Sequence, residues 1–186
     1  MKTVFVFTAV LVAMFMYGGF GVSPRSFAHV ATPIFSQFHS QSTHLDDVVS
    51  VVRVVDGDTI VVGTGGTEEK VRLIGIDTPE TVDPRKPVQC FGKEASDEAK
   101  RLMTGGQVKL VSDTTQSDRD TYGRLLRYVY LQDGTFVNKK MIEEGFAYEY
   151  TYHVPYQFQT EFKSAQALAQ KEKRGLWADG VCEEKL

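Results

Sequence analysis

Apolar and turn-forming positions alternate in the first half of the folded region in a way that predicts short strands. Three segments have the β-branched content that is typical of strands, namely Val48–Val55, Thr59–Val62 and Glu69–Ile76. The residues Asp56-Gly57-Asp58 and the glycine-rich stretch Gly63–Gly66 separate these segments as turns. The pattern therefore predicts three consecutive strands, of which the second and third form a hairpin.

The remainder of the pattern predicts three helices and two further strands. Apolar residues recur at helical spacing in Lys93–Met103 and in Tyr156–Arg174, and Phe136–Glu144 is a short helical segment. The two strands are Gln107–Ser112 and Gly123–Leu131. Five strands in meander-like order, interrupted by one helix, fit a five-stranded OB-fold barrel with about three helices, in a mainly β member of the α+β class.

The N-terminal part has a different pattern. Lys2 precedes an apolar run from Val4 to Tyr17, which is typical of a secretory signal peptide or of an uncleaved membrane anchor. We assign residues 1–28 to this segment, residues 29–47 to a flexible polar linker without a period, and residues 48–186 to the folded domain. This organisation predicts a protein that is secreted, or anchored with its domain outside the membrane.

Composition narrows the possible functions. The chain has 186 residues, which is room for one domain and a tail, and its net charge of −3 argues against a basic protein that coats DNA. Three of the four histidines (His29, His39 and His44) lie in the predicted linker, so a histidine-rich zinc site has little support. Two cysteines cannot form a four-cysteine zinc site, but they can form one disulfide.

Two aspartates mark a candidate metal site. Asp58 begins the second predicted strand and Asp77 follows the third. If these strands pair through the glycine-rich hairpin, both carboxylates lie near one rim of the barrel. Two carboxylates and a backbone carbonyl form a hard oxygen site, which suits Ca²⁺.

Three further charged residues add the groups that phosphodiester hydrolysis requires. Glu80 is a spare carboxylate that could orient or deprotonate water, and Arg72 and Arg124 could hold phosphate oxygens. Arg72 shares a strand face with Ile76 by parity, which brings it towards Asp77. Taken singly, each motif has an ordinary interpretation as a turn, a helix start or a surface charge.

Together these motifs resemble the staphylococcal nuclease family. The resemblance covers about residues 48–177 and rests on five blocks that occur in order: Asp56–Thr59, Val71–Thr81, Phe91–Ser96, Asp120–Arg124 and Leu176-Trp177. It implies an OB-fold barrel with helices and a Ca²⁺-dependent nuclease that cuts DNA and RNA. It also implies products that end in 3′-phosphate, because water attacks phosphorus and the 5′-oxygen leaves.

The resemblance also implies a role for each site residue. The metal ligands would be Asp58, Asp77 and the backbone carbonyl of Thr78. Glu80 would act on the attacking water, and Arg72 and Arg124 would bind phosphate. Tyr122 matches a tyrosine that hydrogen-bonds a substrate phosphate.

The chain departs from the family pattern at two substrate contacts. Thr121 stands where the best-known member has a lysine, and Thr151 stands at the place of a tyrosine that stacks on a nucleobase. Tyr150 and Tyr152 flank Thr151, and stacking on an aromatic ring tolerates any base. We therefore expect one of these two tyrosines either to stack on substrate or to serve in packing.

The best-known member lacks both cysteines of this chain. Cys90 precedes the first predicted helix and Cys182 lies beyond Trp177. In a secreted chain such a pair predicts a disulfide that ties down the C-terminal tail, with free thiols as the alternative.

Other functions remain as alternatives. One is a noncatalytic OB-fold module of the same family that binds nucleic acid or protein. Another is a metal nuclease of different architecture that uses Asp58 with Glu68-Glu69-Lys70, and a third is a secreted Ca²⁺-binding structural module, which would have no use for the two arginines. We expect the protein to be a monomer, with DNA and RNA as its substrates.

Overall fold

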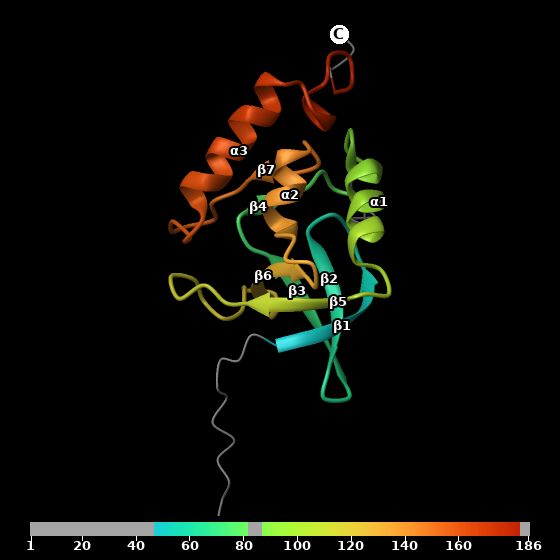
Figure 1. Ribbon diagram of the computed structural model, residues 1–186, viewed down its shortest axis with the longest axis vertical. Coiled ribbons are helices and arrows are strands. Elements are labelled where there is room, and N and C mark those ends of the chain that lie inside the picture. The colour runs from blue at the N-terminus through green and yellow to red at the C-terminus, as the bar shows by residue number, and fades with distance from the viewer. Residues whose placement is uncertain (1–46, 82–86, 183–186) are drawn as a thin grey trace, which may run out of the picture. The chain divides into compact units, whose positions relative to one another are not determined.

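The computed structural model describes residues 47–81 and 87–182 (Figure 1). The predicted signal peptide or anchor and almost all of the predicted linker lie outside these described residues. Among the helices of the described part, none combines the length and apolar character that crossing a bilayer requires.

Five strands close into a barrel, which confirms the predicted fold class. They are β1 (Asp47–Val54), β2 (Thr59–Thr64), β3 (Thr67–Leu73), β5 (Gln107–Val111) and β6 (Leu125–Leu131). Their order around the barrel is β1-β2-β3-β6-β5. The expected meander is wrong at one point, because β3 pairs in parallel with β6 and β5 returns to pair with β1. The helix between β3 and β5 is what allows the chain to cross over to the other edge.

The predicted third strand is too long. It ends at Leu73, and the chain turns at Gly75, whose φ is +79°. A Cβ atom at Gly75 would lie 2.6 Å from the ring of Tyr156 and 2.9 Å from that of Phe162, so the turn and its close packing both need glycine. Beyond it, β4 (Ile76–Asp77) pairs with β7 (Tyr148–Glu149) in a separate two-stranded sheet that the sequence did not predict.

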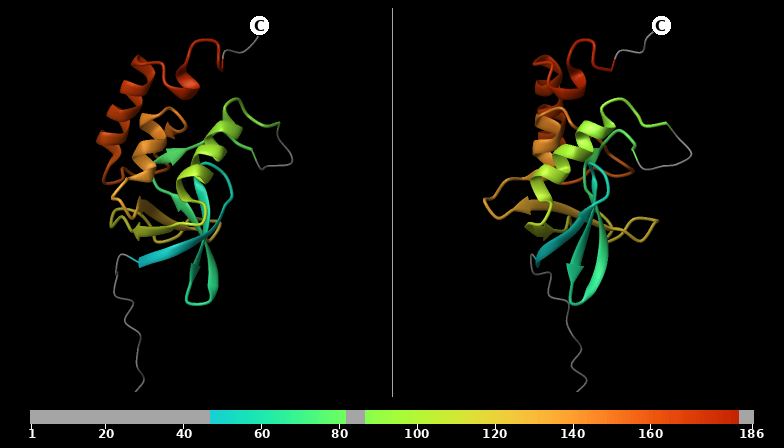
Figure 2. Two further views of the ribbon diagram at one scale, coloured as in Figure 1. Left: turned by 45° about the vertical axis from the view of Figure 1, so that its right-hand side comes forward. Right: turned by 90° about the vertical axis from the view of Figure 1, so that its right-hand side faces the viewer.

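Three α-helices lie together on one side of the barrel, drawn above it in Figure 1. They are α1 (Gly92–Met103), α2 (Val137–Glu143) and α3 (Gln159–Lys171), followed by the short 3₁₀ helix η1 (Gly175–Trp177). Helix α1 contacts β1, and α2 lies between β6 and α3. The two further views in Figure 2 show α1 and α3 on different sides of α2.

Helix α3 begins three residues later than the pattern predicts. The hydroxyl of Tyr156 donates to Glu149 Oε1 at 3.0 Å, and its ring lies 5.4 Å from that of Phe162. These contacts hold Tyr156 outside the helix, against the turn at Gly75.

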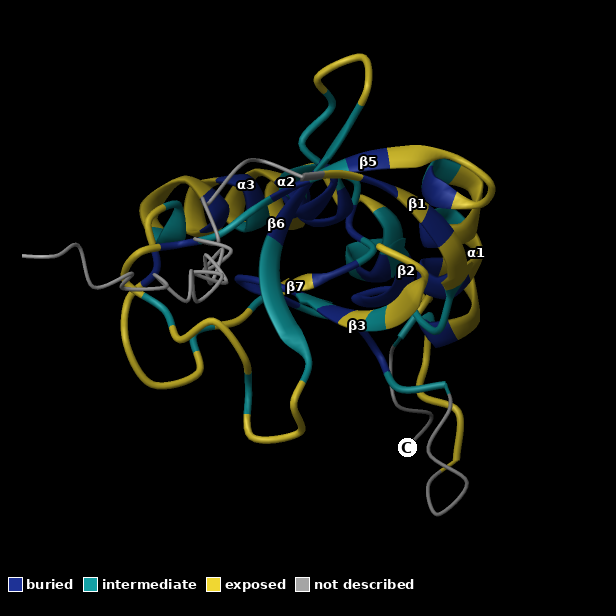
Figure 3. Cartoon of the chain, turned by 90° about the horizontal axis from the view of Figure 1, so that it is seen from below, coloured by how far each residue is buried: buried dark blue, intermediate teal, exposed yellow. Residues whose placement is uncertain are grey.

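The buried residues come from the barrel strands and from all three α-helices, and they form one hydrophobic core. Figure 3 colours these buried positions dark blue along the chain. The polar residue Asn138 of α2 is fully buried among them. Its Nδ2 donates to the carbonyl of Ile74 at 2.8 Å, and its Oδ1 accepts from the N–H of Val129 at 2.9 Å. One side chain thus joins α2 to β6 and to the turn that precedes Asp77.

Candidate active site

Asp58 is buried at the start of β2 and is held from several directions. The carboxylate of Asp56 accepts a hydrogen bond from the N–H of Asp58 at 3.1 Å. Asp58 Oδ1 accepts from the hydroxyl of Thr59 at 2.9 Å. Its Oδ2 accepts from the N–H of Thr78 at 2.9 Å and from the Thr78 hydroxyl at 3.1 Å. Gly57 permits this contact, because a Cβ there would lie 2.6 Å from the Thr78 side chain.

Arg72 joins the two aspartates. Its Nη2 lies 2.9 Å from Asp77 Oδ1 and 3.2 Å from Asp58 Oδ2. Its Nη1 donates to the carbonyls of Leu73 at 3.0 Å and Ile76 at 2.7 Å. The structure therefore brings Asp58, Arg72 and Asp77 together at one rim, as the sequence predicted. Arg72 does not share a strand face with Ile76 as predicted, because β3 ends at Leu73 and the Arg72 side chain reaches the Ile76 carbonyl across the turn.

The charges of Glu80 and Arg124 both act on the carboxyl group of Asp77. Burial, then the charge of Asp58 and that of Glu80, raise the pKa of Asp77, while Arg72 and Arg124 act to lower it. The charges of the other four residues named from the sequence thus all act on the carboxyl group of Asp77. Glu80 itself accepts a hydrogen bond through Oε1 from the N–H of Thr81 at 2.9 Å.

Arg124 is positioned by Asp120, a residue to which sequence reasoning gave no role. Asp120 Oδ2 accepts from Arg124 Nε at 2.6 Å, and Oδ1 accepts from the backbone N–H groups of Arg124 and Tyr122, both at 2.9 Å. Burial alone would raise the pKa of Asp120, but the hydrogen bonds from Arg124 hold that pKa below its usual range. Arg124 Nη1 lies 3.4 Å from the hydroxyl of Thr59, which also donates to Asp58.

Asp56 is a second residue that sequence reasoning treated only as part of a turn. Burial, and then the neighbouring charge of Asp58, raise the pKa of Asp56 to about 7. An acidic residue two positions before the predicted metal ligand Asp58 is a signal that could have found Asp56. Asp120 could have been found as the first residue of an Asx turn that precedes an arginine.

The predicted substrate-binding tyrosines are all exposed. Tyr122 is 83% exposed, and the guanidinium of Arg124 lies 5.4 Å from the centre of its ring. Tyr150 and Tyr152 follow β7 with ring centres 6.3 Å apart. The N–H of Tyr150 donates to the carbonyl of Gly75 at 3.0 Å, which ties this segment to the turn before Asp77. Thr151 lies between them and donates to Glu149 Oε1 at 2.6 Å.

The carboxylates of Asp58 and Asp77 fit a divalent cation. Both oxygens that contact Arg72 Nη2 lie within 3.2 Å of that single nitrogen, so the two carboxylates converge on one cationic point. Oxygen donors of this kind suit hard cations. In the described ranges, no three histidine, cysteine, aspartate or glutamate side chains gather closely enough to hold a metal by themselves. A metal here would need donors beyond the two carboxylates, such as a backbone carbonyl, water or substrate.

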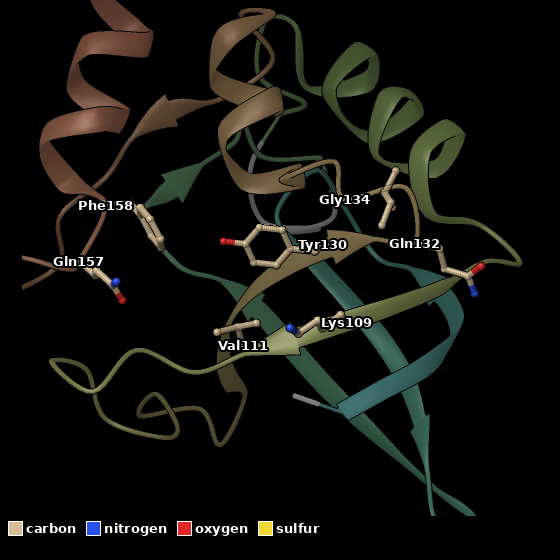
Figure 4. A pocket seen from close by; sticks show the side chains of 8 residues that line it. Lys109, Val111, Tyr130, Gln132, Gly134, Gln157 and Phe158 are labelled. Atoms are coloured by element: carbon tan, nitrogen blue, oxygen red, sulfur yellow. The ribbon is translucent and has the colours of Figure 1, made fainter. Parts of the chain in front are cut away.

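Two further features lie outside this cluster. Cys90 and Cys182 form a disulfide, which confirms that pairing and not the alternative of free thiols. A groove lies between β5, β6 and the start of α3, where Lys109, Tyr130 and Phe158 line it (Figure 4). None of the predicted site residues lines this groove.

The chain is similar in sequence to known proteins. Residues 70–179 match the model of the family described as staphylococcal nuclease homologue. The chain is 45% identical over 134 residues to a thermonuclease of Staphylococcus hyicus, which spans 72% of this chain and 78% of that protein. It is 44% identical over 127 residues to a thermonuclease of Staphylococcus intermedius, spanning 68% and 74% of the two chains.

A third similarity extends beyond staphylococci. The chain is 40% identical over 131 residues to the SPbeta prophage-derived endonuclease YokF of Bacillus subtilis (strain 168). The match covers 70% of this chain and 44% of that protein. The family match begins at Lys70, so it includes Arg72, Asp77, Glu80 and Arg124, and Asp58 precedes it.

Proposed function

The chain belongs to the staphylococcal nuclease family and is a nuclease that hydrolyses phosphodiester bonds of nucleic acid, and from this premise we propose how its charged cluster performs that reaction. The proposed reaction is Ca²⁺-dependent cleavage of DNA and RNA by water, which leaves 3′-phosphate ends. The observation that carries it is the convergence of Asp58 and Asp77 on Arg72, within electrostatic range of Glu80 and Arg124.

Asp58, Asp77 and the backbone carbonyl of Thr78 would hold the metal ion. The N–H and hydroxyl of Thr78 donate to Asp58, and Arg72 joins Asp58 to Asp77, so these residues are held close together. When bound, Ca²⁺ supplies positive charge that stabilises the phosphate as negative charge builds on its oxygens. Its preference for irregular oxygen coordination agrees with a site in which two carboxylates leave room for water and substrate.

Arg72 and Arg124 would bind the phosphate of the scissile bond. Both guanidiniums are held by carboxylates, Arg72 by Asp58 and Asp77 and Arg124 by Asp120. Their side chains are therefore oriented before substrate arrives, which reduces the entropy lost on binding. Donors fixed in this way stabilise the transition state more strongly than donors that must reorganise.

Glu80 would accept the proton of the attacking water. The water oxygen forms a bond to phosphorus, the bond from phosphorus to the 5′-oxygen breaks, and the 5′-oxygen leaves and takes up a proton. The phosphate stays on the 3′-oxygen. Tyr122 beside Arg124, and Tyr150 or Tyr152, would contact the neighbouring phosphate and base.

We also propose that the protein acts outside the cytoplasm, either released or anchored. The support is the apolar run Val4–Tyr17 after Lys2, together with the disulfide, which is typical of oxidising compartments. The alternative of a noncatalytic binding module is not retained, because such a module would not need both arginines and Glu80.

Substitution of Glu80 tests the proposed chemistry. Glu80→Gln keeps the shape of the side chain but removes the proton acceptor, so we expect kcat to fall on the order of a hundredfold or more. Glu94→Gln, at an exposed position of α1, is the matched control and should keep full activity. Cleavage of single-stranded DNA by Glu80→Gln at a rate within twofold of the unchanged protein would remove Glu80 from the mechanism.

A further inference from the structure

The backbone of Glu80 is held at both ends by a single residue, Gln89. The N–H of Glu80 donates to the side-chain Oε1 of Gln89 at 2.8 Å. The carbonyl of Glu80 accepts from the N–H of Gln89 at 2.9 Å. One glutamine therefore fixes both peptide groups that flank the Cα atom of Glu80.

The start of helix α1 contacts both Gln89 and the backbone of Glu80. The N–H of Gly92, the first residue of α1, donates to the carbonyl of Gln89 at 3.0 Å. A Cβ atom at Gly92 would lie 2.9 Å from the carbonyl oxygen of Pro79 and 3.2 Å from that of Glu80. The start of α1 thus lies directly against the backbone at Glu80, and Gln89 connects the two.

The disulfide begins at the next residue along the chain. Cys90 is bonded to Cys182, 92 positions later in the sequence, with the two Cα atoms 5.7 Å apart. Cys182 follows η1, and the N–H of Leu176 in η1 donates to the carbonyl of Gly145 at 2.9 Å. The C-terminal tail is therefore fixed to the domain, and through Cys90 it restrains Gln89.

We propose that Gln89 is a positioning residue for Glu80 and that the Cys90–Cys182 disulfide holds Gln89 in place for this task. The proposal rests on the proposed role of Glu80 in catalysis. Glu80 must lie within hydrogen-bond reach of the attacking water, and a displacement of about 1 Å in such a group can lower a rate by about a hundredfold. Gln89 is exposed, so its conservative replacement is compatible with folding.

Two substitutions at position 89 separate positioning from packing. Gln89→Met keeps the length of the side chain but removes the oxygen that accepts from Glu80, and we expect it to lower kcat about tenfold or more with KM unchanged. Gln89→Glu keeps an acceptor oxygen and should retain kcat within about threefold of the original value. Gln132→Met, at an exposed glutamine beyond β6, is the matched control and should leave both constants unchanged.

The contribution of the disulfide is tested by a double-mutant cycle. The variant Cys90→Ser with Cys182→Ser should lower kcat several-fold in the unchanged background, because Gln89 then loses its restraint. In the Gln89→Met background the same pair of serines should cause no further loss, since both changes act through one contact. Losses that multiply would show that the disulfide acts by another route and would overturn that part of the proposal.

Glu80→Gln, measured in the same assay on single-stranded DNA, distinguishes failure of this proposal from failure of the proposed function. If Glu80→Gln is fully active, the role of Glu80 fails and the positioning proposal fails with it. If Glu80→Gln is inactive but Gln89→Met has the original kcat, only the positioning proposal is wrong. A fall in kcat that is the same for Gln89→Met and Gln89→Glu would also overturn it, because it would not depend on the acceptor oxygen.

Discussion

At the scale of single residues, the site consists of charged side chains that hold one another. Arg72 contacts Asp58 and Asp77, and Arg124 contacts Asp120. The sequence alone predicted four of these five residues, because carboxylates and arginines at strand ends are informative when they occur together. It gave no role to Asp120, since the hydrogen bonds that define that role depend on how a loop closes. The catalytic and metal-binding roles themselves stay predictions.

Asp113, which lies outside the site, is also a carboxylate held by several hydrogen bonds. It is buried, and it accepts from the Tyr128 hydroxyl at 2.6 Å and from the N–H groups of Gln157 and Thr115, each at 2.8 Å. Burial alone would raise the pKa of Asp113, but these hydrogen bonds outweigh it and leave the pKa below its usual range. A carboxyl whose pKa is lowered on folding stabilises the protein above its unfolded pKa. That stability is lost as the pH falls through its folded pKa.

We therefore expect Asp113→Asn to lower the free energy of unfolding by about 1–3 kcal/mol at pH 7. The difference in unfolding free energy between Asp113→Asn and the unchanged protein should become smaller below about pH 4, where the carboxyl is protonated in the unfolded chain. It should decrease further at lower pH. Urea titrations at pH 7 and pH 3 measure both values. Asp179→Asn, at an exposed position, is the control and should change stability little at either pH. A difference for Asp113→Asn that is equal at the two pH values would contradict the account.

At the scale of elements, the sequence pattern predicted the longer helices and strands correctly but missed the two-residue strands. The barrel strands follow from β-branched content and turn residues, and all three helices follow from helical spacing or short helical segments. The two-residue strands β4 and β7 are too short to have a period, and their pairing joins segments about 70 residues apart. The sequence pattern therefore predicted one continuous strand through Gly75. In the structure the chain turns at Gly75, and this turn directs Asp77 towards Arg72.

The turn at Gly75 gives a prediction at this scale. Gly75→Ala forces a side chain into a left-handed conformation and into the rings of Tyr156 and Phe162, so we expect unfolding free energy to fall by about 2–4 kcal/mol. Gly134→Ala is the matched control, because Gly134 has a φ of +85° but, apart from its chain neighbours, no atom of the described residues would lie within 4 Å of the added Cβ. Its cost should be about 1 kcal/mol, from backbone strain alone. Equal losses for the two variants in urea titrations would show that the close packing at Gly75 contributes nothing.

At the scale of the whole molecule, the barrel brings together groups that lie far apart in the sequence. Asp58 precedes β2, Arg72 lies near the end of β3, and Arg124 immediately precedes β6. These three positions meet because β2 pairs with β3 and β3 pairs in parallel with β6. The sequence predicted the first pairing from its hairpin, whereas the second depends on the closure of the barrel, which a local pattern does not specify.

The Cys90–Cys182 disulfide stabilises the fold of the whole domain. It closes a segment of 92 residues, which in the chain-entropy description stabilises the folded state by about 4–5 kcal/mol. The two cysteines made this pairing predictable, because no other partner is present in the chain. Its position next to Gln89 was not predictable as a functional feature, since it depends on the contacts between Gln89 and Glu80.

Asp58, Asp77, Glu80 and the two arginines together make up the proposed Ca²⁺-dependent nuclease site. The most direct measurement is cleavage of single-stranded DNA by the full chain with Ca²⁺, with Mg²⁺ and with a chelator, followed by analysis of the product ends. We expect cleavage with Ca²⁺ that yields 3′-phosphate ends, little cleavage with Mg²⁺, and none with the chelator. Cleavage that is undiminished by the chelator, or products with 5′-phosphate ends, would contradict this account of the site.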